Sequence, residues 1–442
     1  MRAFYLLLGT CFCAAALPAQ DESSLTLEDA ARLAMEHHPD VGKARAQADA
    51  LKGRIREVRA QALPEVNIVS DAMRWRDPSL LNASGLDKFP VELRSALVPS
   101  PVNIFDYSIT VKQPLFTQGK VGTALRLANI EAEGSLSEID RARQDVALNT
   151  VKAFYDLLWA ERYHVLVAET QKQKELHAAM ARTRYQNGVA TEVDVLRSEV
   201  AVANGAPDLV RARNAIQQAR ALLNYYIGRP LDASTHLIGD FQEKPWEASN
   251  LDDLERDAVR RRPEIQRLRI AERSAATQCD LAKAESRLRL DFAGSYGLMS
   301  RLPQNLVNSE FTRWTAGVNF TLPVFDGFRR SGMVWRATAN GRAARLEREK
   351  FEQQLRLAIQ QGYDELKAAA ETIAAARSNV SQAEKVLTMM QNNYKYGAAT
   401  TLDIVDAQTA LSVARTNLLR GLHDYSVARA NLRWTTGQTP WE

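Results

Sequence analysis

The chain has 442 residues, of which 45% are hydrophobic and 25% are charged, and its formal net charge is only +4. This composition is typical of a folded protein with room for one large domain or two to three ordinary ones. The basic residues form no polybasic block, which argues against nucleic acid as a partner.

The N-terminus reads "MRAFYLLLGTCFCAAALPAQ", with one Arg, an apolar run and then small residues. This order is typical of a secretory signal peptide, with cleavage after Ala16 or Ala19. The alternative is a membrane anchor, but the run is shorter than the roughly 20 residues that a spanning helix needs. We therefore predict residues 1–19 as a signal peptide of an exported protein.

Cysteine usage fits export without disulfides. Cys11 and Cys13 fall within the predicted signal peptide, and neither follows the small residue that a lipoprotein signal needs. Cys279 is then the one cysteine left, so we expect no internal disulfide. No later stretch reaches 18 continuous apolar residues, so we predict no transmembrane helix. If the chain enters a membrane, it must do so with strands.

The sequence is internally duplicated. "LEDAARLAMEHHPD" from Leu27 is similar to "LDDLERDAVRRRPE" from Leu251, and later matches such as Gly188 with Gly397 keep a constant offset. The one net length change falls between residues 64 and 113. We expect a first repeat at 20–232, a linker or equatorial segment at 233–250, a second repeat at 251–438 and a C-terminal tail at 439–442.

Each repeat contains two predicted strands. Residues 104–113 and 313–322 alternate between apolar and polar side chains, and weaker candidates precede them at 64–75 and 288–298. A period of two indicates strands with two different faces. Their length matches the roughly 9–11 residues of a tilted membrane-spanning strand. The alternative is a half-buried soluble hairpin.

A long helix follows each second strand, after the breakers "PLFTQGK" and "PVFDGFRR". The predicted ranges, 120–187 and 329–396, lack Pro and would each form a helix about 100 Å long. In the second helix, apolar and small residues recur at steps of four and three, which predicts a coiled-coil seam or plain antiparallel packing. The seam is Phe351, Leu355, Ile359, Gly362, Leu366, Ala369, Ile373, Ala376, Val380, Ala383, Leu387, Met390 and Tyr394.

A Pro-containing motif and a pair of histidines in the helical region are interpreted as structural features. "ANGAPD" at 203–208 indicates a helix break, either where shorter helices stack end to end or at a simple Pro kink. His37 and His38 precede Pro39 and are expected on the surface of a helix. No His, Cys and Asp cluster, phosphate-binding loop or nucleophile motif is visible, so we predict no catalytic residue, metal or cofactor, and no enzyme.

The predicted fold class is mainly α with a small β part. Four strands per chain cannot close a barrel, because the smallest spanning barrels have about eight. An open edge in lipid would leave backbone groups unsatisfied at several kcal/mol each. The chain must therefore associate: two chains would supply eight strands and three would supply twelve.

The chain resembles the TolC family of outer-membrane channels. The resemblance covers essentially the whole mature chain and rests on the duplication, on "QPLFTQGK" and "LPVFDGFRR", and on "YQNGVATEVDVLRSE" and "YKYGAATTLDIVDAQTAL". It implies a homotrimer with a twelve-stranded β-barrel in outer-membrane lipid and a long periplasmic α-barrel of coiled helical hairpins. It further implies a passive exit duct of tripartite efflux or type I secretion, opened by a periplasmic adaptor and driven by an inner-membrane pump of RND, ABC or MFS type. The alternative is a structural or adhesive coiled-coil protein of the envelope.

The two repeated turns are the predicted functional tips. Each Gly lets the backbone leave a helix with positive φ, and the following Thr-x-x-Asp is a capping box. The resemblance places these turns at the periplasmic tip, in contact with the adaptor. The family pattern can carry a basic residue at Ala399, so a latch there is absent or built differently. The tip residues are Gly188, Val189, Ala190, Thr191, Gly397, Ala398, Ala399 and Thr400.

The resemblance also implies a gate. Asp403 and Asp406 would form rings of negative charge that select cations and bind polyvalent ones. For Asp194 and Asp403 the alternative role is helix capping alone, whereas Asp406 has no capping role. The first-repeat counterpart of Asp406 is Arg197, which suggests a contact between them in neighbouring hairpins. Tyr394 matches a tyrosine of the family gate and is expected to hydrogen-bond across the tip.

The strand-to-helix junctions are the remaining motif of both repeats. Each pairs a Pro that ends the strand with a Gly that precedes the helix. The predicted junction residues are Pro114, Gly119, Pro323 and Gly327.

Overall fold

The computed structural model describes residues 24–76, 90, 101–241 and 250–441. The predicted signal peptide lies outside these residues. The chain divides into two compact units: the first comprises Met1–Gly42, Arg141–Arg262 and Gln354–Glu442, and the second comprises Lys43–Asp140 and Pro263–Gln353. Each unit draws segments from both predicted repeats, so a repeat is not a compact unit by itself.

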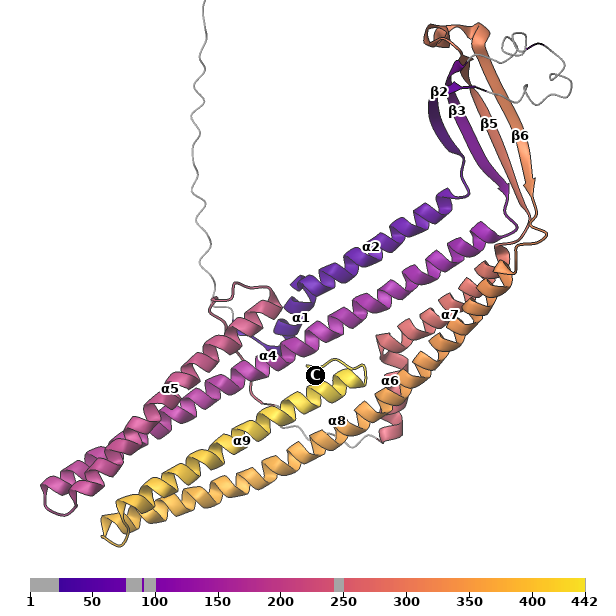
Figure 1. Cartoon of the computed structure of the whole chain (residues 1–442). Helices are drawn as coiled ribbons and strands as arrows, with labels where there is room; N and C mark the ends of the chain where they lie inside the picture. The colour runs from indigo at the N-terminus through magenta and orange to yellow at the C-terminus, as the bar shows by residue number, and fades with distance from the viewer. Residues whose placement is uncertain (1–23, 77–89, 91–100, 242–249, 442) are drawn as a thin grey trace, which may run out of the picture. The chain divides into compact units, whose positions relative to one another are not determined.

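The second unit contains one four-stranded antiparallel sheet (Figure 1). Its strand order is β2-β3-β5-β6, so β2 and β6 are the edge strands and β3 pairs with β5 at the centre. The strand bounds are Glu65–Trp75 for β2, Val102–Phe116 for β3, Arg289–Ser300 for β5 and Thr312–Thr321 for β6.

The two faces of this sheet differ in polarity. Directly opposite residues of neighbouring antiparallel strands have their side chains on the same face of the sheet. The register therefore shows which residues form a row across the four strands on each face. Trp314, Tyr296 and Ile68 are 70%, 63% and 68% exposed, so the apolar face has no cover within the described chain. An uncovered apolar face of this kind indicates lipid or protein contact. One apolar row is Ile68, Ile109, Tyr296 and Trp314, and the adjacent polar row is Asn67, Thr110, Ser295 and Thr315.

The expected role of Pro114 as a strand terminator is wrong. Strand β3 continues through Pro114 to Phe116, with a register irregularity at this point. Strand β2 begins at Glu65, opposite Lys112, and does not extend alongside Pro114, so β3 has only β5 beside it there. A proline lacks the backbone N–H, and a strand tolerates it where one edge is unpaired. The chain leaves the strand after Phe116 instead.

The two long helices have the lengths expected from the sequence. Helices α4 and α8 each contain 67 residues, and each ends one residue before its predicted range. None of the described helices combines the length and apolarity that crossing a bilayer requires. The helix bounds are Leu27–His37 (α1), Pro39–Ala60 (α2), Lys120–Gln186 (α4), Glu192–Ile227 (α5), Leu251–Arg261 (α6), Pro263–Ala284 (α7), Arg329–Lys395 (α8) and Thr401–Thr435 (α9).

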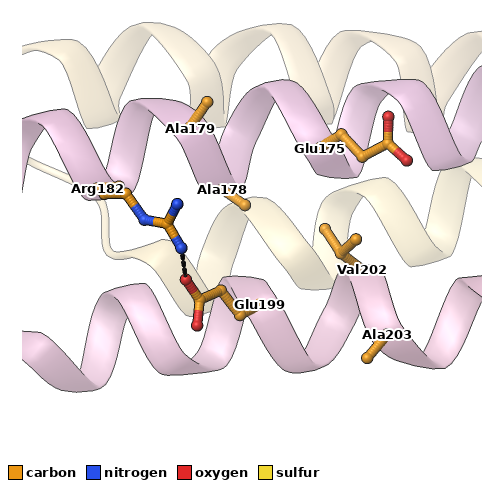
Figure 2. Close-up of a pocket in the computed structure, with 7 residues that line it drawn as sticks. All are labelled: Glu175, Ala178, Ala179, Arg182, Glu199, Val202 and Ala203. Atoms are coloured by element: carbon orange, nitrogen blue, oxygen red, sulfur yellow. Dashed lines mark hydrogen bonds and ion pairs between the residues drawn. The ribbon is translucent and has the colours of Figure 1, made fainter.

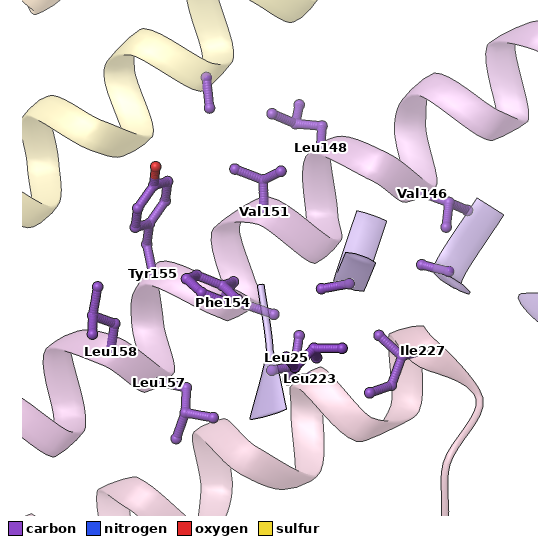
Figure 3. Packing of buried hydrophobic residues seen from close by; sticks show 14 of the residues in the cluster. Leu25, Val146, Leu148, Val151, Phe154, Tyr155, Leu157, Leu158, Leu223 and Ile227 are labelled. Carbon is purple, nitrogen blue, oxygen red and sulfur yellow. The ribbon is translucent and has the colours of Figure 1, made fainter. Parts of the chain in front are cut away.

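The first unit has a hydrophobic core where α4, α5 and the N-terminal segment meet (Figure 3). Phe154, Leu157 and Leu223 are among its fully buried side chains, and each contributes about 1.5–3 kcal/mol by burial. Strand β1, Ser24–Leu25, pairs in parallel with β4, His236–Leu237, and ties the predicted linker to the chain start. Strands of two residues have no periodicity, so the sequence did not predict this pair.

The seam predicted in α8 is buried or half-buried at every position. Near the tip, Leu387 packs with Ala407 and Leu411 of α9. An ion pair of 2.7 Å between Arg415 and Glu384 joins the same two helices. From Leu355 onward the stripe therefore serves an antiparallel hairpin within the first unit, one of the two interpretations that the sequence left open.

The end-to-end stack of shorter helices, one of the two interpretations of 203–208, is wrong, while the Pro kink stays a prediction. Helix α5 runs without interruption from Glu192 to Ile227, with Pro207 inside it. At Gly205 of the same motif, an added Cβ would lie 2.0 Å from the Oε1 atom of Gln171 on α4, so the flexible Gln171 side chain would have to move.

The expected surface position is wrong for His38, although His37 is exposed. His38 is 3% exposed and stacks on Tyr226 with ring centroids 5.6 Å apart. Its Nδ1 accepts a hydrogen bond of 3.2 Å from the backbone N–H of Asp40, which satisfies a donor in the first turn of α2. The histidine therefore joins α1 to α2 and packs on α5.

Candidate functional site

The first hairpin tip joins α4 to α5. Gly188 has φ of +72°, and the N–H of Val189 donates to the carbonyl of Arg184 at 2.9 Å, which closes the end of α4. Thr191 then caps α5. Its Oγ1 accepts from the N–H of Asp194 at 3.3 Å, and the Asp194 carboxylate accepts from the N–H of Thr191 at 3.0 Å. The predicted capping box is present.

The second tip, between α8 and α9, repeats this geometry. Gly397 has φ of +76°, and the N–H of Ala398 donates to the carbonyl of Asn393 at 2.9 Å. The Asp403 carboxylate accepts from the N–H of Thr400 at 2.7 Å, and the N–H of Asp403 donates to Thr400 Oγ1 at 3.3 Å. The two tips therefore share one backbone design.

The capping hydrogen bonds stabilise the ionised carboxylates. The backbone and side-chain hydrogen bonds of Thr400 lower the pKa of Asp403. The side-chain and then the backbone hydrogen bond of Thr191 lower the pKa of Asp194, and hydrogen bonding to the Thr401 side chain adds to this. Both aspartates thus carry a negative charge at neutral pH and cap a helix at the same time.

The other predicted gate residues take different positions. Asp403, Asp406 and Arg197 are exposed, and Asp194 is half-buried. Within the described part of one chain, no ion pair joins Asp406 to Arg197. The charge of Arg197 instead lowers the pKa of Asp194, its neighbour one turn earlier. Of the eight tip residues, Ala190 and Ala399 are half-buried and the others are exposed.

Tyr394 lies inside the protein. It is 8% exposed, and its hydroxyl lies 3.4 Å from Oγ1 of Thr401 across the turn. Its carbonyl accepts a 2.9 Å hydrogen bond from Nη1 of Arg184, whose guanidinium lies 4.4 Å from the centre of the tyrosine ring. The ring centroids of His177 and Tyr394 lie 5.5 Å apart. Helix α4 thus contacts the second tip through Arg184 and His177.

Sequence reasoning missed Arg184 and His177. Their contact with Tyr394 joins segments about 210 residues apart, and no local pattern encodes it. The one available signal was the His itself, a polar residue close to the apolar stripe of a long helix.

A groove of about 420 Å³ lies on the α4–α5 hairpin near the first tip. Small side chains line its floor, and Arg182 on α4 forms an ion pair with Glu199 on α5 at one end (Figure 2). The groove is lined by Glu175, Ala178, Ala179, Arg182, Glu199, Val202 and Ala203.

The strand-to-helix junctions belong to the second unit. Gly119 and Gly327 have positive φ angles of +85° and +63°. In the second junction, Oδ2 of Asp326 accepts from the N–H of Arg330 at 2.9 Å, which satisfies a donor in the first turn of α8. Pro323 precedes this turn and is exposed. Glycines and a capping carboxylate therefore make these junctions, and Pro114 lies within a strand.

Among the described residues, no group of three or more His, Cys, Asp or Glu side chains is arranged to hold a metal ion. The Asp194 and Asp403 carboxylates of the two tips cap helices.

The model of the outer membrane efflux protein family matches residues 30–229 and 254–438. The chain is 23% identical to outer membrane protein TolC of Escherichia coli, over 95% of this chain and 83% of that protein. It is 22% identical to the alkaline protease secretion protein AprF of Pseudomonas aeruginosa, over 95% of this chain and 85% of that protein.

Solved structures share the fold. The CmeC outer membrane channel of Campylobacter jejuni matches with a TM-score of 0.78 at 16% identity, covering 93% of this chain and 85% of that one. The outer membrane protein VceC of Vibrio cholerae matches with a TM-score of 0.73 at 19% identity, covering 94% of this chain and 97% of that one. With matches over both halves of the sequence, the chain belongs to the outer membrane efflux protein family, and it is an outer-membrane exit channel with a long periplasmic helical part.

Proposed function

We propose that the chain forms a passive homotrimeric duct, which a periplasmic adaptor opens and an inner-membrane pump of RND, ABC or MFS type drives. The observation that carries this proposal is the four-stranded sheet. Its edge strands β2 and β6 have free outer edges within the described chain, and one of its faces is apolar and exposed. Unpaired edges cannot remain in lipid, so further copies of the sheet must cover them.

Three copies would supply twelve strands, enough to close a membrane-spanning barrel around a water-filled lumen. The polar row of the sheet, which includes Thr110 and Ser295, would then face the lumen, and the row with Trp314 and Tyr296 would face lipid. In this arrangement the pump supplies the energy for transport, and the duct is passive.

We assign the gate to the second tip. Three copies of Asp403 and Asp406 would make two rings of negative charge, one helical turn apart, that concentrate cations at the entrance. Asp403 is held in place by its cap, whereas Asp406 is exposed and free of capping bonds. The exposed turn residues of both tips, Gly188–Thr191 and Gly397–Thr400, would contact the adaptor.

Purified protein in planar bilayers tests this gate. We expect cation preference and block by polyvalent cations added from the periplasmic side. The Asp403→Ala and Asp406→Ala double variant should lose both properties. Because Asp403→Ala also removes a cap, Thr400→Ala is the matched control: it breaks the same capping box and keeps both carboxylates. If the double variant keeps cation preference and block, the gate assignment is wrong.

A further inference from the structure

A cavity of about 630 Å³ lies between α4, α8 and α9, beside the second tip. Its volume is within the range of about 300–1,000 Å³ that small-molecule sites occupy. Neither the proposed gate carboxylates nor the exposed turn residues line it. Its lining residues are Gln173, Leu176, His177, Ala179, Met180, Thr183, Arg184, Gln391, Tyr394, Lys395, Ile404 and Gln408.

Three buried nitrogen atoms around this cavity have no hydrogen-bond partner: Nδ1 and Nε2 of His177 and Nε of Arg184. His177 is only 2% exposed. A guanidinium donates through all its N–H groups, and a neutral imidazole donates through one nitrogen. Buried donors are normally paired, so this group of atoms calls for an acceptor.

The positions of the two side chains bring these donors toward one place. Arg184 follows His177 by seven residues, two helical turns, so both lie on the same face of α4. Helical side chains lean toward the N-terminus, which directs Arg184 back toward His177. Both contact the ring of Tyr394, at 4.4 Å for the guanidinium and 5.5 Å for the imidazole.

The charged side chains that line the cavity are all basic. Arg184 and Lys395 are cationic, and no Asp or Glu is among the lining residues. Burial lowers the pKa of His177, so its ring is neutral at neutral pH and offers one N–H donor. The cavity also has an apolar part, formed by Leu176, Met180 and Ile404. The side-chain amides of three glutamines provide further polar groups.

We propose that this cavity binds a small carboxylate with an apolar body, such as an aromatic acid, whose carboxylate accepts hydrogen bonds from His177 and Arg184. Lys395 supplies further positive charge at the C-terminal end of α8, and the apolar walls hold the ring or chain of the ligand. This site does not depend on conduction, and a chain that forms no pore still tests it.

The test uses the full chain in detergent with benzoate as the probe and benzyl alcohol as its neutral counterpart, followed by calorimetry and ligand-observed NMR. We expect saturable benzoate binding and at least tenfold weaker binding of benzyl alcohol. Lys395→Gln should weaken benzoate severalfold, and His177→Phe, which fills the cavity, should abolish binding. Lys385→Gln is the matched control, because Lys385 is exposed on α8 outside the cavity.

The proposal is overturned if benzoate shows no saturable binding to the folded wild-type chain, which would mean that water alone satisfies the buried nitrogens. It is also overturned if benzyl alcohol binds as well as benzoate, or if Lys395→Gln binds benzoate like Lys385→Gln. Lys395 is exposed, so its substitution keeps the fold and gives an answer even where His177→Phe is unstable.

Discussion

The two hairpin tips have the same backbone and different surroundings. Their glycines have φ of +72° and +76°, and the same Thr and Asp capping box starts each following helix. The side chains then diverge: Tyr394 is 8% exposed, whereas its counterpart Tyr185 is 45% exposed. A duplicated sequence therefore specifies a turn twice, and contacts from other segments decide what each turn does.

The largest expected contrast comes from truncating the two tyrosines. Tyr394→Ala should lower the opening free energy of the last turns of α8 by about 3 kcal/mol, because a buried ring and its contact with Arg184 are lost. Tyr185→Ala should stay within about 0.5 kcal/mol, since its ring is largely exposed. Native-state hydrogen exchange of both hairpins measures this, and equal effects would remove the asymmetry between the tips.

The glycines should behave alike. At Gly188 and Gly397 an added Cβ meets no atom within 4 Å, so an alanine is penalised only by the positive φ. We expect Gly188→Ala and Gly397→Ala each to cost about 1–2 kcal/mol, again by hydrogen exchange of the adjoining turns. A cost at one tip that is several times the cost at the other would show that the backbones are not equivalent.

Mild acid should weaken the second tip through His177, at a pH above that at which the capping aspartates of either tip titrate. Burial lowers the pKa of His177 below the usual 6.5, and the cations that face it are Arg184 on α4 and Lys395 on α8. As the pH falls below about 6.5, His177 binds a proton in the unfolded chain but stays neutral where it is packed. The free energy that favours the packed tip therefore decreases by at most about 1.4 kcal/mol per pH unit. Above that pH the contribution is constant.

The control for this acid effect is His177→Gln, which removes the titrating ring. We expect the second tip of the wild type to lose hydrogen-exchange protection on acidification and that of His177→Gln to lose much less. An identical pH response in the two proteins would exclude His177 as the cause.

The smallest expected effects are those of the caps. Thr191→Ala and Thr400→Ala each remove one capping acceptor and should destabilise the first turn of the following helix by about 1 kcal/mol, with recovery in the Ser variants. Protection of the first-turn amides of α5 and α9 gives the comparison. Failure of Ser to restore protection at either tip would argue against the capping role.

Local patterns in the sequence predicted much of this fold. The Pro-free ranges gave both 67-residue helices, and the steps of four and three gave the buried stripe of α8, because periodicity reflects the face that packs. The capping boxes were predicted because their residues are adjacent in sequence. These features need no knowledge of distant segments.

The errors arise where a distant segment decides the outcome. Pro114 is tolerated in β3 because β2 begins only at Glu65, opposite Lys112, and Gly205 lies where the Gln171 side chain approaches from α4. His38 is buried by tyrosines of α5, and Tyr394 is enclosed by residues of α4. No spacing rule in one segment contains this information.

Single-channel recording of the purified protein in planar bilayers tests the central claim most directly. The account predicts stepwise conductance with a reversal potential that favours cations, and this preference should disappear in the Asp403→Ala and Asp406→Ala double variant. A protein that stays silent in bilayers and behaves as a soluble monomer would contradict the duct.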